Sequence, residues 1–145
     1  DFELVLVTHQ RRMSRRPRLA ELRNSRFILF PVGSRMQQPI DRYFAAHGFE
    51  PNVIMRFDNA EAIKAMISSG LGMSMLPLWV VDKDLKSGRL TFLRQKEAPL
   101  YSKIALVSRR SSYFAQPVRA FIAQARKIVW RSLRLATSAA PQTQL

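Results

Sequence analysis

Short apolar runs alternate with helix-like apolar stripes along most of the chain. Runs rich in Val, Ile, Leu and Phe predict buried strands, because these side chains pack well on a pleated surface. The predicted strands are 2–8, 27–30, 52–57, 72–77, 90–93 and 104–108. Apolar positions three or four apart, bounded by Gly or Asn, predict helices. The predicted helices are a single turn at 19–22, a helix between 34 and 48, 60–69, and about 115–130.

The order of these elements predicts the fold class. Strands that alternate with helices of this length are typical of an α/β fold, in which helices cover a mostly parallel sheet. The first strand and the one at 104–108 are expected to connect this unit to other structure. In the last helix six residues are expected to face inward: Val118, Phe121, Ile122, Ala125, Ile128 and Val129. Without a partner surface, the helix would expose an apolar stripe that includes Val118, Phe121, Ile122 and Trp130.

Composition narrows the class of protein. The 145 residues suit one ordinary domain, and 47% hydrophobic residues exclude wholesale disorder. The absence of cysteine excludes disulfides, thiolate metal sites and a cysteine nucleophile. Lys and Arg number 24 against 10 Asp and Glu, a net charge of +14. This excess favours nucleic acid, an anionic membrane or an anionic ligand as partner, unless it forms only a solvated surface.

No catalytic motif is present. The sequence has no nucleophile elbow, phosphate loop or zinc-protease helix. Asp58 and Glu61 lie at the start of a predicted helix, where carboxylates usually cap the backbone N–H groups of the first turn. His47 lies near a helix end and is expected on the surface, whereas His9 follows the first strand and could contact a ligand. An enzyme is therefore not indicated.

Two loops follow predicted parallel strands and precede helices. They are Pro31-Val32-Gly33-Ser34 and Asp58-Asn59. In open α/β sheets ligands bind at the carboxyl ends of strands, and free N–H groups at helix starts attract anions. The residues alone leave two interpretations open: a small-ligand site, or turns and caps with no further role.

Several segments together carry a family resemblance. The sequence Phe27 to Ser34 is followed by Tyr43 to Pro51, and then by the block from Asp58 through Glu61-Ala62-Ile63-Lys64 to Gly70-Leu71-Gly72 and Leu76-Pro77. Ser87-Gly88-Arg89-Leu90, the 104–107 run and Pro117 to Phe121 come later in the same order. This set resembles the C-terminal effector-binding region of LysR-type transcriptional regulators.

The resemblance implies a type 2 periplasmic-binding-protein-like fold. This chain would hold its second subdomain, the two hinge strands and the C-terminal helix, and the last helix would pack on a first subdomain absent from this sequence. The implied parts of a partial domain at 1–131 are an outgoing hinge strand at 1–9, the second subdomain at 26–101, a return hinge strand at 102–109 and a helix at 113–131, with a flexible tail at 132–145.

The resemblance also implies a site between the two subdomains. In the family a small, often anionic effector binds there. The implied ligand-binding residues are Pro31, Val32, Gly33, Ser34, Asp58, Asn59 and Pro77, and the implied hinge residues are Thr8, His9, Val107 and Ser108. No metal and no cofactor is expected.

The leading hypothesis is therefore a non-enzymatic, cytoplasmic effector-sensing domain from a bacterial regulator. The chain starts inside an apolar run without Met, and we interpret it as a piece of a longer protein. The intact protein would bind DNA through an N-terminal helix-turn-helix, form a homodimer or homotetramer, and not enter a membrane. The alternatives are a periplasmic solute-binding protein of the same fold, and a nucleic-acid-binding module that acts through the Arg-rich segment 11–26.

Overall fold

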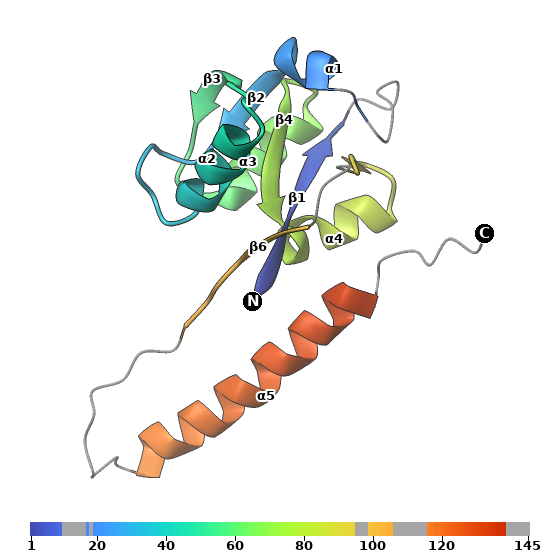
Figure 1. The fold of residues 1–145 in the computed structure, drawn as a ribbon. Coiled ribbons are helices and arrows are strands. Elements are labelled where there is room, and N and C mark those ends of the chain that lie inside the picture. The colour runs from blue at the N-terminus through green and yellow to red at the C-terminus, as the bar shows by residue number, and fades with distance from the viewer. Residues whose placement is uncertain (10–16, 18, 95–98, 106–115, 139–145) are drawn as a thin grey trace, which may run out of the picture. The chain divides into compact units, whose positions relative to one another are not determined.

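The structure, a computed structural model, describes residues 1–9, 17, 19–94, 99–105 and 116–138. It divides into two compact units, one formed by 2–102 and the other by Asp1 with 103–145. The strands are β1 (Phe2–Thr8), β2 (Arg26–Leu29), β3 (Asn52–Arg56), β4 (Met73–Pro77), β5 (Thr91–Phe92) and β6 (Leu100–Ser102). The helices are α1 (Leu19–Arg23), α2 (Gln37–Ala46), α3 (Ala60–Ser68), α4 (Leu78–Lys86) and α5 (Gln116–Ser138) (Figure 1).

The strands of the larger unit form one sheet in the order β3-β2-β4-β1-β5, with β6 also paired to β1. β2 runs parallel to β3 and β4, as the alternating pattern predicts. β1 runs antiparallel to β4, β5 and β6. The α/β class is confirmed. Among the described strands, β1 runs in one direction and the other five run in the opposite direction.

The core lies on and around β2 and β4. All five residues of β4 are buried, because the strand lies inside the sheet and α3 and α4 pack against it (Figure 1). Phe27 of β2 is fully buried and meets Phe44 and Phe49 edge-on at centroid distances of 5.5 and 5.6 Å. Such aromatic pairs add to the stabilisation from burial alone. This unit therefore has a hydrophobic core of its own.

The two glycines of the Gly70-Leu71-Gly72 motif are needed for different structural reasons. Gly70 ends α3 with φ of +80°, a conformation that favours glycine. A Cβ on Gly72 would lie 2.5 Å from the carbonyl oxygen of Arg26. Glycine at 72 therefore lets β4 approach the backbone at the start of β2.

Two elements differ from the sequence predictions. Helix α4 was not predicted; it buries Val81 and Asp84 and begins directly after Pro77. The strand predicted at 104–108 is wrong over its described part, since residues 103–105 are exposed and outside any strand. The strand that pairs with β1 is β6, a few residues earlier. Leu106 to Ser108 lie outside the described residues.

Helix α5 begins close to its predicted start but continues to Ser138, into the segment expected to be a flexible tail. The described positions of the inward face predicted for this helix are of two kinds. Val118 and Phe121 are 41% and 64% exposed, and Ile122 and Ala125 are partly buried. The side chains of Ile128 and Val129 lie outside the described part. Residues 139–145 are also not described.

Candidate functional site

Three predicted ligand segments meet at one edge of the sheet. Because β2, β3 and β4 are parallel, their carboxyl ends lie at the same edge, and the segments that follow lie there too. The amide of Phe57 donates to the carbonyl of Leu29 at 3.0 Å, which joins the ends of β3 and β2. Pro77 ends β4 opposite Leu4 of β1. The structure thus brings together Pro31–Ser34, Asp58–Asn59 and Pro77.

The loop after β2 is a tight turn that presents an apolar tip. The amide of Ser34 donates to the carbonyl of Pro31 at 3.1 Å, and Gly33 has φ of +76°. The hydroxyl oxygen of Ser34 accepts from the amide of Gln37 at 3.2 Å, so it caps the start of α2. Val32 is 76% exposed. The loop therefore offers an apolar side chain and a hydroxyl group with a free hydrogen.

Gln37, which sequence reasoning missed, holds the start of this loop through a buried side-chain hydrogen bond. Its side chain is fully buried, and its Oε1 accepts from the amide of Phe30 at 3.1 Å. Its Nε2 donates to Oδ1 of Asp41 at 2.7 Å. Both ends of the amide are thereby satisfied, as buried polar groups require. The loop is held by a side-chain bond in place of a continued strand ladder.

The segment after β3 shows the predicted helix cap. Oδ1 of Asn59 accepts from the amide of Glu61 at 2.8 Å, so the expected N-cap is confirmed. Asp58 is exposed beside it. At the third strand end, Pro77 is buried and occupies the N-cap position of α4. Asn59 and Pro77 therefore serve the fold at this edge, whatever else they contact.

Arg56 is a second residue that sequence reasoning missed. It is the last residue of β3, and its Nη1 donates to the carbonyl oxygen of Phe30 at 2.6 Å. The residue is exposed. No local sequence signal could have found this contact, because it joins residues 26 positions apart. A cation therefore lies at the start of the Pro31–Ser34 loop.

The two expected hinge residues that the structure describes, Thr8 and His9, do not lie at this edge. Thr8 is buried at the far end of β1, paired with Met73 and Thr91, and its hydroxyl donates to the carbonyl of Gly72 at 3.4 Å. Nδ1 of His9 lies 2.9 Å from the carbonyl oxygen of Arg89. Both residues belong to the larger unit, which the chain enters at Phe2. Val107 and Ser108 lie outside the described residues.

The comparisons with known proteins identify the family. The sequence model of the LysR substrate binding domain matches residues 1–130. This chain belongs to the LysR substrate-binding domain family. It is thus an effector-sensing type of domain, and the alternative of a periplasmic solute-binding protein is not supported.

Curated relatives of this LysR domain are transcriptional regulators. The uncharacterized HTH-type regulator YusT of Bacillus subtilis is 26% identical over 106 residues, which are 73% of this chain and 36% of YusT. A RuBisCO operon transcriptional regulator of Allochromatium vinosum is 30% identical over 103 residues, 71% of this chain and 34% of that protein. The LysR domain chain spans about a third of the length of these relatives.

Solved structures share the fold of this LysR domain. The regulatory domain of CcmR from Synechocystis PCC6803, in complex with 2-PG, matches with a TM-score of 0.67 and 21% identity. The match covers 88% of this chain and 62% of that one. The effector-binding domain of QuiR, in complex with shikimate, gives a TM-score of 0.66 at 21% identity, covering 95% and 63%. The type 2 periplasmic-binding-protein-like fold implied by the sequence resemblance is thereby confirmed.

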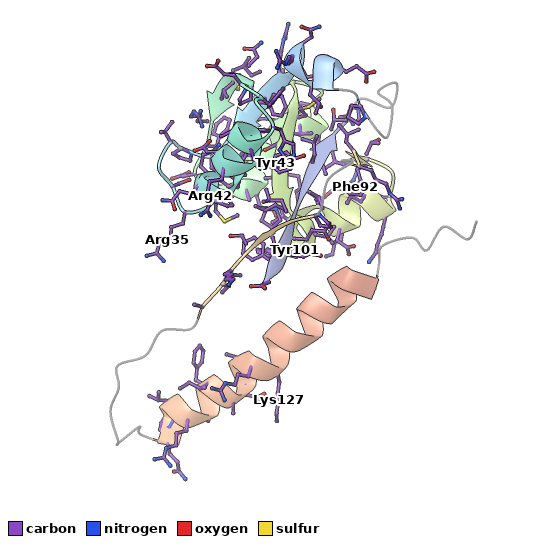
Figure 2. The ribbon with its side chains drawn as sticks, viewed as in Figure 1. Arg35, Arg42, Tyr43, Phe92, Tyr101 and Lys127 are labelled. Atoms are coloured by element: carbon purple, nitrogen blue, oxygen red, sulfur yellow. The ribbon has the colours of Figure 1, made fainter. Side chains whose placement is uncertain are left out.

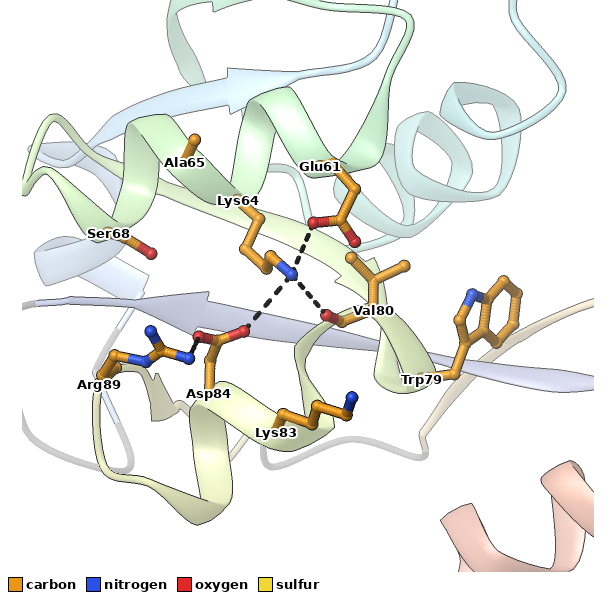
Figure 3. A pocket seen from close by; sticks show the side chains of 9 residues that line it. All are labelled: Glu61, Lys64, Ala65, Ser68, Trp79, Val80, Lys83, Asp84 and Arg89. Carbon is orange, nitrogen blue, oxygen red and sulfur yellow. Dashed lines mark hydrogen bonds and ion pairs between the residues drawn. The ribbon is translucent and has the colours of Figure 1, made fainter.

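A separate hollow of about 450 Å³ lies between α3 and α4 of the LysR domain (Figure 3). Nζ of Lys64 lies 2.6 Å from Glu61, 3.5 Å from Asp84 and 3.2 Å from the carbonyl oxygen of Val80. The bond to Glu61 is the main cause that raises the pKa of Lys64 above its ordinary value, against the opposing effect of burial. Asp84, buried, also pairs with Arg89 at 2.8 Å. These charges satisfy one another and join the two helices.

Two further searches of the LysR domain concern the described residues alone. No three His, Asp or Glu side chains within them are grouped so that they could bind a metal ion. No helix in the same part of the chain has the length and apolar character needed to cross a bilayer. The hollow and the sheet edge are both candidate surfaces for a small ligand.

Proposed function

We propose that this chain is part of the effector-sensing region of a DNA-binding transcriptional regulator, and that its sheet edge binds a small anionic ligand. The observation that carries the proposal is the meeting of three strand ends at that edge. Each is followed by a loop or helix start, and free N–H groups at helix starts favour anions. Ligands bound to CcmR and QuiR, 2-PG and shikimate, support a small ligand of this class.

The ligand residues we propose are those at this edge. They are Pro31, Val32, Gly33, Ser34, Asp58, Asn59 and Pro77. Ser34 offers a hydroxyl hydrogen, because its oxygen already caps Gln37. Val32 offers an exposed apolar side chain at the loop tip. The site would hold the polar group of an effector while an apolar contact excludes water from one side.

The hinge we propose lies within the two expected hinge strands, 1–9 and 102–109, at the pair Phe2 and Ser102. Phe2 of β1 pairs in register with Ser102 of β6, and the chain leaves the larger unit after Ser102. This pair lies near Leu4 and hence near Pro77, at the same edge as the loop. Bending at Phe2 and Ser102 would move whatever lies beyond them relative to the ligand.

The mechanism of the intact regulator follows from linkage. A ligand shifts a conformational equilibrium only by its difference in affinity for the two states. An effector that contacts this edge and another subdomain would favour the arrangement in which both contacts are made. We propose that this change alters a homodimer or homotetramer that binds DNA through a helix-turn-helix outside this sequence, in the cytoplasm and without enzymatic activity.

Amide NMR of the chain tests this proposal, with shikimate and 2-PG as the added ligands. We expect shifts confined to residues 31–36 and 58–61 and to the start of α4. Ser34→Ala should weaken binding several-fold by removing one hydrogen bond. Ser69→Ala, the same substitution at the C-terminal end of α3 and away from this edge, should leave binding unchanged. Shifts confined to the hollow between α3 and α4, or no saturable shift at millimolar ligand, would contradict the proposed site.

A further inference from the structure

Arg56 lies where a cation could serve the candidate loop. Its Nη1 donates to the carbonyl oxygen of Phe30, the residue directly before that loop, at 2.6 Å. The other backbone group of Phe30, its amide, donates to Oε1 of Gln37. Two side chains therefore complete the hydrogen bonding of Phe30, at the point where the β2 ladder ends. One of these side chains is charged and exposed.

The charge of Arg56 has no carboxylate partner among the described residues. The ion pairs that the structure describes join Lys64, Lys86 and Arg89 to carboxylates. The exposed Asp58 follows two positions later but is not among the carboxylates in these ion pairs. An unpaired guanidinium at a ligand edge is able to accept an anion without first breaking an ion pair.

The contact with Phe30 also orients the guanidinium. An arginine has five N–H donors in a planar fork, and the carbonyl of Phe30 occupies one of them. The remaining donors match the spacing of two oxygens of a carboxylate or phosphate. Because one bond already restricts the side chain, less conformational entropy is lost when an anion binds.

We propose that Arg56 is the anion-binding residue of the candidate site and accepts the carboxylate or phosphate group of the effector. This inference rests on the proposed function and names the group that would set its preference for charged ligands. Two other arginines are the competing assignments, Arg35 in the loop and Arg42 on α2. Both are exposed, and neither side chain makes a hydrogen bond or ion pair with a described residue. Figure 2 shows Arg35 projecting away from the ribbon.

The test compares charge-matched variants of the full chain. Arg56→Gln and Arg42→Gln each remove one positive charge, and Arg56→Lys keeps the charge without the planar fork. The probes are shikimate and its methyl ester, followed by amide NMR, with the melting temperature of each variant as a check on folding. We expect Arg56→Gln to weaken shikimate binding about tenfold or more, Arg56→Lys to weaken it less, and Arg42→Gln to leave it unchanged.

The ester separates anion binding from a merely structural role. The native chain should bind the neutral ester more weakly than shikimate, and Arg56→Gln should bind both alike. Loss of both ligands by the same factor would mean that Arg56 only holds the loop, and would overturn the inference. An unchanged preference in Arg56→Gln, or its loss in Arg35→Gln, would overturn it as well. If the native chain binds neither ligand at the edge, the proposed function itself fails.

Discussion

Two phenylalanines that the sequence predicts to be buried differ in their exposure in the structure. Phe27 in β2 is fully buried, whereas Phe121 in α5 is 64% exposed. Both belong to apolar patterns that predict a buried face. In the larger unit that face meets other elements of residues 2–102, while in α5 Val118 and Phe121 are exposed and Ile122 and Ala125 are partly buried. A periodic apolar pattern predicts which side chains need cover, and the rest of the protein decides whether they have it.

Phe27→Ala should give the largest effect within this comparison. It would remove the ring that contacts Phe44 and Phe49 and leave a cavity in the core. Substitutions of this kind cost about 3–5 kcal/mol of unfolding free energy. Urea unfolding followed by the near-ultraviolet signal measures the loss. A loss below 1 kcal/mol would contradict the described core.

Gly72→Ala should give a smaller but clear loss. The added Cβ would meet the backbone carbonyl of Arg26, which cannot rotate away. Overpacking of this kind costs about 1–3 kcal/mol and should separate β4 from the start of β2. Gly88→Ala is the opposite case, since its Cβ would meet nothing within 4 Å and only its φ of +71° opposes the change. A loss below about 0.5 kcal/mol for Gly72→Ala would remove the close approach as the reason for Gly72.

Phe121→Ala should give the smallest effect, within about 0.5 kcal/mol in the same urea experiment. Because the side chain is mostly exposed, its truncation removes little buried surface and opens no cavity. A loss comparable to that of Phe27→Ala would show that α5 has a packed apolar face in solution. The contrast between the two units would then be wrong.

Much of the site edge was predictable because its signals are local. A strand followed by Asn59 and a helix predicts a cap, and the structure has that cap. The Pro31–Ser34 loop follows from the run before it and the helix after it. Parallel strands then place these loops at one edge without further information.

The residues that sequence analysis missed depend on non-local partners. Arg56 and Gln37 act on the backbone of Phe30, and nothing in their own neighbourhood marks that contact. The strand beside β1 was placed too late in the chain, because Ile104 and its neighbours are more apolar than Leu100–Ser102. Pairing with β1, not local apolar content, decides that strand. Helix α4 was missed because its charged residues interrupt its apolar stripe.

Amide hydrogen exchange of the native chain tests the central claim most directly. We claim that residues 2–102 form a self-contained unit with its own core that carries the candidate ligand edge, and that α5, with Phe121 64% exposed, is not part of that core. The amides of β1, β2 and β4 should therefore exchange only at the rate of global unfolding, and those of α5 much faster, by local opening. Protection of α5 equal to that of β4 would contradict the account.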